Sequence, residues 1–505
     1  MTSIAWSAFS GCSGLTSVTI PNSVTSIGDI AFENCSKLAS VTIVSGVASI
    51  GKDAFSGTNL KKTIWLTNTP PSGYSNAKGV INYVSNEQYS SISNKIVYPF
   101  LSSIFEVDGI KYVPVNPSER TCDAIDCVYN ASSTKITISS DVSYKGVNMK
   151  VKKVQPYICY NNQYVESLTF DIESDVVKYS FNGCTNLKNL SLGNKVTAIG
   201  EYSFEGCHAL KSVIIPNSVT RLDIYSFSGC ILLSDITIGN QVQTIGKSAF
   251  SNCKSLASII IPKSVKNINN SVFYGRKSLQ TVVIADRSDE LTLGGNDKSP
   301  LFADCPLDSV YIGGNITYNT SSNNGYSPFY RNMTLRSVTI TDKETEISPN
   351  EFYGCAKLKN VRIGDGVTTI GDWAFSGCSS LDYFAFGSSV KTIGKEAFSD
   401  CAAMTRIISR AATPPTCGSQ ALDDINKWNC TLSVPKGSTS AYQQADQWKE
   451  FFFIDNDVTK IGTLTNEHVS YAKIYDLNGR KMENMKPGLN IFRMSNGKTK
   501  KVMVK

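Results

Sequence analysis

Cysteine and histidine are the residues of this chain that could bind a metal ion, form disulfides or act as nucleophiles. The sequence holds 15 Cys but only two His, His208 and His468. So few imidazoles exclude most His-ligated metal sites and every Cys–His dyad or Ser–His–Asp triad that needs a well-placed His. We therefore predict no catalytic residues, no cofactor and no metal centre.

Most of the cysteines share one position, three residues after a recurring phenylalanine. They are Cys12, Cys35, Cys184, Cys207, Cys230, Cys253, Cys305, Cys355, Cys378 and Cys401. Because free Cys packs like a small apolar residue, we interpret them as a buried column of thiols. A disulfide or metal ladder is the alternative, but Thr58, Arg276 and Asn332 replace Cys without breaking the pattern. Outside the column, Cys122 and Cys127 are a possible local disulfide.

The element that must position these residues is a repeat of 23 residues. One clean copy, residues 15–35, has the pattern Leu-x-x-Val-x-Ile-Pro-x-Ser-Val-x-x-Ile-Gly-x-x-Ala-Phe-x-x-Cys. The alternation in Leu-x-x-Val-x-Ile predicts a half-buried strand, which Pro ends because it has no N–H to donate. Gly then turns the chain, since it adopts backbone angles that other residues avoid. The repeat is marked by Phe9, Phe32, Phe55, Phe181, Phe204, Phe227, Phe250, Phe273, Phe302, Phe329, Phe352, Phe375 and Phe398.

A unit of this length cannot bury its apolar face alone, so successive copies must stack. The sequence therefore predicts a mainly β, elongated solenoid with short parallel strands about 4.8 Å apart. The repeat pattern resembles the BspA-type leucine-rich repeat, also called LRR type 5, over about two thirds of the chain. Members of that family are bacterial or protozoan surface and secreted proteins linked to adhesion. The resemblance implies a leucine-rich-repeat solenoid and an adhesin-like role.

The repeats fall into two arrays, which gives four regions. We predict a first, N-truncated array with its terminal cap over residues 1–97 and a β-hairpin lead-in over 98–155. A second array with its cap follows over 156–457, and a small basic β module over 458–505. Both arrays end on Thr-Pro-Pro, one strand and a short helix, which we interpret as caps that shield the end of a stack.

The net charge of +7 belongs to the last region. Residues 458–505 hold ten Lys/Arg and three Asp/Glu, so the two arrays are neutral and no nucleic-acid partner is predicted. No apolar run is long enough for a transmembrane segment, and no secretion signal is visible in this chain. In the tail, Tyr-Asp-Leu-Asn-Gly-Arg (475–480) precedes Pro487-Gly488. It resembles the C-terminal sorting domain of type nine secretion cargo, which implies export; a small β-domain is the alternative.

A ligand is expected on strand positions that face outward. One such position per turn forms a row across the sheet: Thr19, Thr42, Thr169, Ser191, Ile214, Thr237, Ile260, Val283, Tyr311, Thr339, Arg362, Ala385 and Ile408. From Ile214 to Tyr311 the row is largely apolar on a face that should be wet, which is typical of interaction sites. Two lengthened turns, which contribute residues 285–300 and 313–328, sit at the same place, and the second adds Tyr318 and Tyr326. The candidate ligand face is therefore Ile214, Ile260, Val283, Tyr311, Tyr318 and Tyr326, unless the insertions fold over the sheet and cover it.

We predict a non-enzymatic extracellular or cell-surface recognition protein that binds a protein or glycan of a host or of neighbouring bacteria. The alternatives are a β-solenoid enzyme acting on polysaccharide and a structural spacer. Such an enzyme needs charged residues clustered on adjacent strands, whereas Asp235, Arg362 and Arg406 are scattered. The acidic stretch 286–297 lacks the ligand spacing of a calcium loop and is expected to be a solvated insertion.

Overall fold

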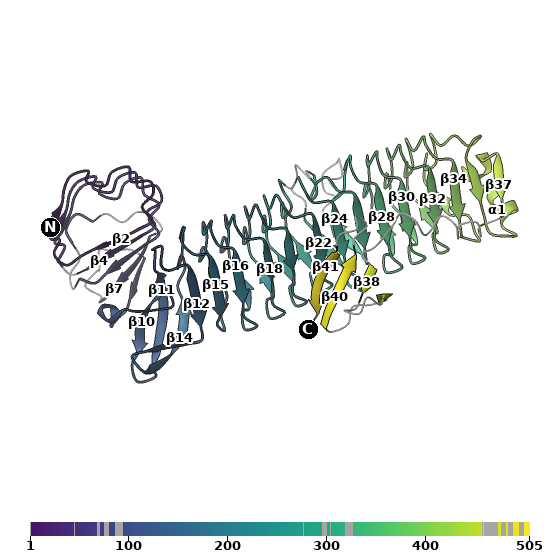
Figure 1. The fold of residues 1–505 in the computed structure, drawn as a ribbon. Helices are drawn as coiled ribbons and strands as arrows, with labels where there is room; N and C mark the ends of the chain where they lie inside the picture. Colours follow the sequence, from purple (N-terminus) through teal and green to yellow (C-terminus); the bar gives the residue numbers. More distant parts are fainter. Residues whose placement is uncertain are drawn as a thin grey trace. The chain divides into compact units, whose positions relative to one another are not determined.

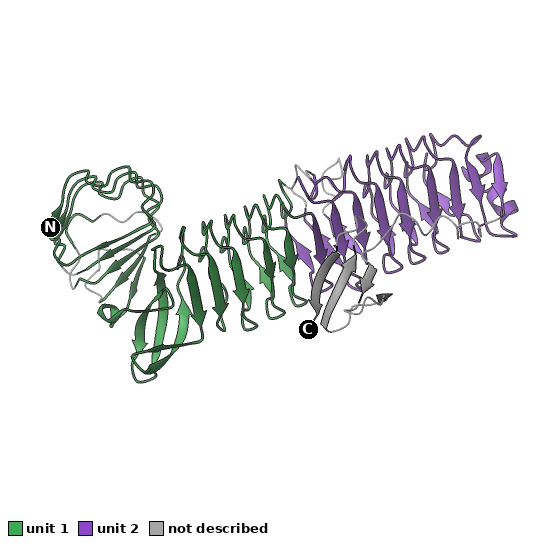
Figure 2. Ribbon diagram, in the orientation of Figure 1, with its two compact units in different colours: residues 1–256, 271–276 green, residues 257–270, 277–505 purple. Residues whose placement is uncertain are grey.

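The computed structural model is nearly all-β, and its described residues form the parallel turns of a β-solenoid (Figure 1). It describes residues 2–44, 46–67, 71–74, 80–85, 94–275, 277–294, 300–303, 305–318, 327–456 and 458, and the strand backbone within 473–475, 481–482, 488–493 and 499–504. The predicted fold class is confirmed. The chain divides into two compact units, residues 1–256 with 271–276 and residues 257–270 with 277–505 (Figure 2). The four sequence regions stay a prediction.

The first array lies in unit 1 and has two parallel sheets. Each Ser-Val-x-Ile motif pairs in register with the next, Val18 opposite Val41 and Ile20 opposite Ile43. One sheet has the order β2 (Ser17–Ile20), β4 (Ser40–Ile43), β6 (Lys62–Trp65), β7 (Ile81–Val84) and β8 (Lys95–Val97). The other, of two-residue strands, has the order β1 (Ser3–Ile4), β3 (Ser26–Ile27) and β5 (Ser49–Ile50).

The lead-in follows the short helix η1 (Leu101–Ser103) and forms a mixed sheet. Its order is β13 (Asp141–Tyr144), β14 (Val147–Val154), β11 (Thr121–Cys127), β10 (Ile110–Asn116) and β9 (Phe105–Val107). Hairpins join β9 to β10 at Asp108-Gly109 and β13 to β14 at Lys145-Gly146, as the sequence predicts. The remaining strand, β12 (Lys135–Ser139), pairs in parallel with β15 (Ser167–Asp171) and so begins the sheet of the second array.

The second array continues in unit 1 with one longer and one shorter strand per turn. The longer strands are β16 (Asn189–Leu192), β18 (Ser212–Ile214) and β20 (Asp235–Thr237). The shorter ones are β17 (Ala198–Ile199), β19 (Arg221–Leu222) and β21 (Thr244–Ile245), paired in parallel in that order.

Unit 2 repeats this arrangement. Its longer strands are β22 (Ser258–Ile261), β24 (Thr281–Ile284), β26 (Ser309–Ile312), β28 (Ser337–Ile340), β30 (Asn360–Ile363), β32 (Tyr383–Phe386), β34 (Arg406–Ser409), β36 (Thr431–Ser433) and β37 (Phe453–Asp455). Its shorter strands are β23 (Asn267–Ile268), β25 (Leu291–Leu293), β27 (Ile316–Tyr318), β29 (Glu346–Ile347), β31 (Thr369–Ile370), β33 (Thr392–Ile393) and β35 (Thr416–Cys417). The helix α1 (Thr439–Gln444) and the turn η2 (Trp448–Glu450) accompany the last strands, as the cap prediction expects. The tail strands β38 (Lys473–Tyr475), β39 (Lys481–Met482), β40 (Gly488–Arg493) and β41 (Thr499–Val504) form a separate antiparallel sheet.

The repeated phenylalanines form the core of the stack. In unit 1 the rings of Phe181 and Phe204 are parallel with centroids 5.4 Å apart, and those of Phe204 and Phe227 are 5.2 Å apart. In unit 2, Phe352 and Phe375 stack at 5.3 Å. One ring per turn at this spacing follows from the parallel strands, which hold equivalent residues about 4.8 Å apart. The period read from the sequence is therefore the turn of the solenoid.

The glycine of the Ile-Gly step is needed because the turns pack closely there, and not because its backbone angles are unusual. Gly200 has no positive φ, but a Cβ built there would lie 2.5 Å from the carbonyl oxygen of Val176 in the preceding turn. Gly246 likewise leaves only 2.6 Å to the backbone carbon of Asp223. The step needs glycine because the neighbouring turn occupies the space of a side chain. The physical reason expected from the sequence was therefore wrong, although the turn is in the expected place.

Candidate ligand-binding surfaces

The outward row of unit 2 crosses neighbouring strands without interruption. Ile260 on β22 lies opposite Val283 on β24, which lies opposite Tyr311 on β26. All three are partly exposed, whereas the residues on either side of each in the strand are buried. Side chains of successive strand residues point to opposite faces, so this alternation places the three on the outer face. The hydroxyl of Tyr311 donates to the Asp286 carboxylate at 2.6 Å, which fixes the ring.

A row of hydroxyl groups runs beside this apolar row. Ser258, Thr281 and Ser309 lie two residues before Ile260, Val283 and Tyr311 and therefore on the same face. Each is partly exposed, and the hydroxyls of Thr281 and Ser309 lie 3.2 Å apart. The outer face thus combines apolar contact area with hydrogen-bonding groups.

Of the remaining candidate residues that the structure describes, neither Ile214 nor Tyr318 lies on the three strands of this row. Ile214 lies on β18 of unit 1 with its side chain 66% exposed, beside Thr237. Tyr318 lies on β27, in the sheet of short strands, and its hydroxyl donates to the carbonyl oxygen of Pro349 at 2.8 Å. Burial raises the pKa of Tyr318 well above its ordinary value. Tyr326 lies outside the described residues.

In the first array the same outward row is exposed at Thr19 on β2 but covered in the next two turns. Thr42 on β4 and Ile64 on β6 occupy it, and both are buried. The cover is the lead-in sheet, whose Val113 and Ile125 belong to one apolar cluster with Ile64 and Tyr83. The first array therefore presents its outer strand face mainly to the lead-in and not to a ligand.

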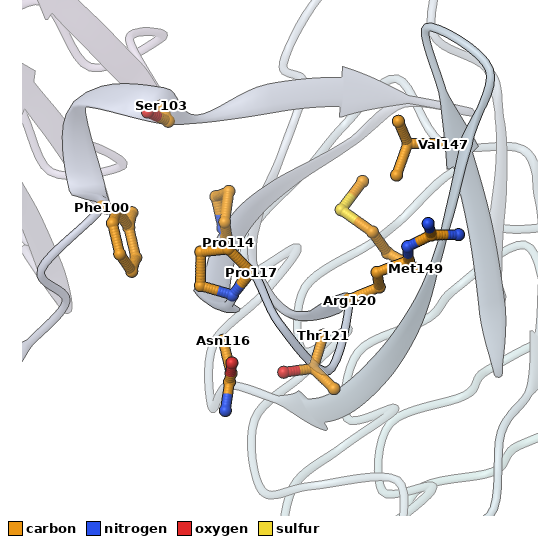
Figure 3. A pocket seen from close by; sticks show the side chains of 9 residues that line it. All are labelled: Phe100, Ser103, Pro114, Asn116, Pro117, Arg120, Thr121, Val147 and Met149. Carbon is orange, nitrogen blue, oxygen red and sulfur yellow. The ribbon is translucent and has the colours of Figure 1, made fainter.

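The lead-in carries an open hollow of about 280 Å³ (Figure 3). Its lining is largely apolar, with Arg120 as the one charged side chain. The lining residues are Phe100, Ser103, Pro114, Asn116, Pro117, Arg120, Thr121, Val147 and Met149. Small-ligand sites usually add several convergent polar groups to an apolar wall. The polar ends of Ser103, Asn116 and Arg120 lie apart and do not converge (Figure 3), so the outer face remains the candidate.

The insertion at residues 285–294 is held by an arginine. The guanidinium of Arg287, which is 4% exposed, donates to the carbonyl oxygens of Val265 at 2.6 Å and Asp289 at 2.9 Å. Burial lowers its pKa, while the Asp289 carboxylate acts in the opposite direction. Within the part of the chain that the structure describes, no group of three or more His, Cys, Asp or Glu side chains could hold a metal ion.

All fifteen cysteines are free thiols, Cys122 and Cys127 included. Column members donate Sγ–H to the carbonyl oxygen of the phenylalanine one turn earlier, as Cys207 does to Phe181 at 3.3 Å and Cys230 to Phe204 at 3.2 Å. Burial raises the pKa of Cys207. Since the thiolate is the reactive form, burial makes these thiols inert.

We expect a thiol reagent to modify Cys12, which is exposed, before any buried column cysteine of the folded protein. Buried Cys207 should react only after unfolding, because its thiol is both inaccessible and un-ionised. Mass spectrometry of the alkylated native and urea-unfolded protein measures this. Rapid native labelling of Cys207 would contradict the buried column.

The BspA type leucine-rich repeat region model matches residues 1–114, 152–292 and 322–445, in six copies. The matched segments make up more than half of the sequence. The chain belongs to the BspA-type leucine-rich repeat family. A comparison with curated proteins found no match. The resemblance of residues 458–505 to a sorting domain lies outside the matched segments.

Solved structures similar to this BspA-type leucine-rich repeat protein come from several bacteria. A leucine-rich repeat protein of Bacteroides ovatus is 24% identical, with 88% of this chain and 84% of that chain covered and a TM-score of 0.39. A leucine-rich cell surface protein of Faecalibacterium prausnitzii is 21% identical, with 70% and 94% covered and a TM-score of 0.34. The pneumococcal vaccine antigen PcpA is 15% identical, with 70% and 98% covered and a TM-score of 0.32.

Sequence reasoning missed a second set of surface residues in unit 1 of this BspA-type protein. Tyr157, Tyr179, Tyr202 and Tyr225 lie at successive turns, and their φ values are 61°, 58°, 55° and 55°. We call them the tyrosine ladder. Left-handed backbone costs about 1–2 kcal/mol per non-glycine residue, and a stacked aromatic pair returns about 0.5–1.5 kcal/mol. Stacking alone therefore does not explain why bulky tyrosines hold a position that suits Asn or Gly.

The tyrosine ladder could have been found from spacing. Tyr179, Tyr202 and Tyr225 recur every 23 residues, each two positions before the repeated phenylalanine of its turn. The sequence does not reveal that this position has positive φ, because Ser, Asp, Asn, Ile, Trp and Glu also occupy it in other turns. The 23-residue spacing of the tyrosines is therefore visible in the sequence, but the strained backbone at this position is not.

Proposed function

We propose that this protein is a non-enzymatic recognition protein that works outside the cell or on its surface and binds a protein or glycan through the outer face of its longer strands. Membership of the BspA-type family supports a protein-interaction role. In the described part of the chain, no helix is both long and apolar enough to cross a membrane.

The observation that carries the proposal is the row of Ile260, Val283 and Tyr311. These side chains sit on adjacent parallel strands, where equivalent residues are about 4.8 Å apart, and so form one continuous contact strip. Apolar and aromatic side chains at the centre of a surface, with polar groups at its edge, are the usual anatomy of a binding site. Here Ser258, Thr281 and Ser309 supply the polar edge.

We also propose that the basic tail, residues 458–505, is an export or attachment module. Its support is the resemblance of the Tyr-Asp-Leu-Asn-Gly-Arg segment to sorting domains and the antiparallel sheet of β38 to β41. Strand β40 pairs with β38 on one side and β41 on the other.

We expect the double variant Ile260→Asp/Tyr311→Ala to lose binding at least tenfold for any ligand found in a screen of matrix proteins, mucins and glycans. A charge at Ile260 breaks the apolar strip, and truncation of Tyr311 removes its aromatic anchor; such anchors typically contribute 2 kcal/mol or more at interfaces, about thirtyfold in affinity. Surface plasmon resonance against each ligand found measures the change.

The matched control is Met333→Asp, which places the same charge on an exposed apolar residue of unit 2 outside the strip; Met333 is 57% exposed. Its affinity should stay within twofold of the parent. Equal affinities for the double variant and the parent, with every ligand found, would exclude this face as the binding site.

A further inference from the structure

The tyrosine ladder of unit 1 forms a continuous aromatic edge. Its ring centroids lie 4.9, 4.6 and 4.9 Å apart, and its interplanar angles are 12°, 3° and 15°. All four side chains are partly exposed. Because each ring face packs on the next ring, the ladder presents ring edges and hydroxyl groups to its surroundings. None of the described residues forms a hydrogen bond with these four hydroxyls.

Tyr160, three residues after Tyr157 in the same turn, links the ladder to the first array. The ring of Tyr160 meets that of Tyr157 edge-on at 5.6 Å, and its hydroxyl accepts a hydrogen bond from the Asn59 amide at 3.0 Å. The Lys61 ammonium lies 5.6 Å from the centroid of the same ring.

Two glutamates lie beside Tyr202 at the middle of the ladder: Glu201 directly precedes it, and the Glu205 N–H donates to the Tyr202 carbonyl oxygen at 3.3 Å. Glu201 and Glu205 both raise the pKa of Tyr202, after the burial of its ring and the effect of Tyr225. Glu205 is half-buried, and Asn182 Nδ2 donates to its Oε2 at 2.8 Å. Burial raises the pKa of Glu205, and that single hydrogen bond lowers it.

Glu205 therefore lacks a counter-charge within the described chain. Lys178 and Lys247 precede Tyr179 and Ser248, but both are exposed and neither forms an ion pair among the described residues. A half-buried carboxylate without a cation is the group that gains most from an arriving guanidinium or ammonium. The free phenol oxygens beside it can accept further N–H donors from the same partner.

We propose that the tyrosine ladder with Glu201 and Glu205 is a docking surface for a segment of a partner protein that presents Lys or Arg side chains. Tyrosine provides a rigid contact with little side-chain entropy to lose, as in binding sites for proteins. The unpaired Glu205 carboxylate favours a cationic protein segment over a glycan or a nucleic acid. A neutral glycan brings no cation, and a nucleic acid brings like charge. This surface is distinct from the outer strand face and does not depend on it.

The test measures fluorescence polarisation of a labelled oligo-arginine peptide with the full chain, at low and high salt. We expect saturable binding that weakens with salt. Glu205→Gln keeps the hydrogen bond from Asn182 but removes the charge, and should raise Kd about tenfold. Tyr202→Phe keeps the ring stack, removes one hydroxyl and should raise Kd severalfold. Circular dichroism checks that both variants remain folded.

The matched control is Glu173→Gln, which neutralises an exposed carboxylate of the same unit; its Kd should stay within twofold of the parent. Equal weakening by Glu173→Gln and Glu205→Gln would overturn the proposal, since it would indicate general charge attraction. The proposal also fails if a neutral oligosaccharide binds in a Tyr202-dependent way while the peptide does not bind. Neither result bears on Ile260 and Tyr311, so the two sites are tested separately.

Discussion

Replacement of Lys62 by methionine is expected to destabilise unit 1 by about 3–5 kcal/mol, the usual cost of removing one partner from a buried ion pair. The Lys62 side chain on β6 is fully buried, and that of Asp126 on β11 is 1% exposed. Their ammonium and carboxylate groups are in direct contact. Among the described residues, Lys62→Met leaves the buried Asp126 carboxylate with Lys111, at 3.4 Å, as its one neighbouring cation.

Lys62 also joins regions that are far apart in the sequence. Besides Asp126 of the lead-in, its ammonium donates to the carbonyl oxygens of Tyr157 and Ile158, each at 2.9 Å, in the first turn of the second array. The Ser40 hydroxyl adds a 3.3 Å hydrogen bond to Asp126 from the first array. Loss of the ammonium therefore weakens the attachment of the first array to both following regions.

Urea unfolding followed by circular dichroism measures the loss. Lys188→Met is the matched control, because Lys188 pairs with Glu166 at 2.9 Å but both side chains are about half exposed. Exposed pairs contribute about 0–1 kcal/mol. The double variant Lys62→Met/Asp126→Asn should recover part of the stability, since no uncompensated charge stays buried. If Lys62→Met cost no more than Lys188→Met, the ion pair would not hold the junction.

The turns of the solenoid were predictable because they repeat. Phe204, Cys207 and Val213 recur in the same order in successive copies, so each position could be assigned to the core or the surface from several copies at once. The strand pairing follows, since Ser-Val-x-Ile motifs align in register. Stacked Phe rings and buried column thiols confirm these assignments.

The junction was not predictable, because Lys62 and Asp126 occur once and lie 64 positions apart. In the repeat, Lys62 takes the place of Ser17 and Ser40, an outward strand position that usually carries a polar residue. Only the packing of the lead-in on that face buries it. Long-range contacts between non-repeated residues leave no periodic signal in one sequence.

The candidate face was predictable in part. Strand alternation places Ile260, Val283 and Tyr311 outward, and the structure shows them adjacent. Tyr318 could not be assigned the same way, because it lies in a segment read as an insertion, whereas the structure places it on a short strand in register with Leu293 and Ile268. The sequence also does not show which outward faces are covered, as Thr42 illustrates.

A buried carboxyl group makes the stability of unit 2 depend on pH. Glu344 is 2% exposed, and burial raises its pKa from 4.5 to about 8. A backbone hydrogen bond from Ile316 opposes this shift, while Glu346 and Glu290 add to it. Its Oε2 has no hydrogen-bond partner among the described residues. The neighbouring Glu351, also buried, has its pKa raised by burial and by Glu344.

The folded state therefore holds the proton on Glu344 more tightly than the unfolded chain does. Its stabilising contribution is fully present below pH 4.5 and is lost as the pH rises to about 8. The slope approaches 1.4 kcal/mol per pH unit within that window. We expect Glu344→Gln, which keeps the shape without the charge, to flatten this slope and to raise the unfolding midpoint at pH 9, as measured by urea titrations across the window.

Glu396→Gln is the control in the same unit, because the pKa of Glu396 is shifted in the direction opposite to that of Glu344. The Glu396 carboxylate accepts a 3.0 Å hydrogen bond from the Trp373 indole and lies 3.2 Å from the Lys395 ammonium. These partners lower its pKa, so its contribution is present above its unfolded pKa and lost in acid. Glu396→Gln should leave the alkaline fall in stability unchanged. Equal alkaline slopes for Glu344→Gln and the parent would show that Glu344 does not take up a proton on folding.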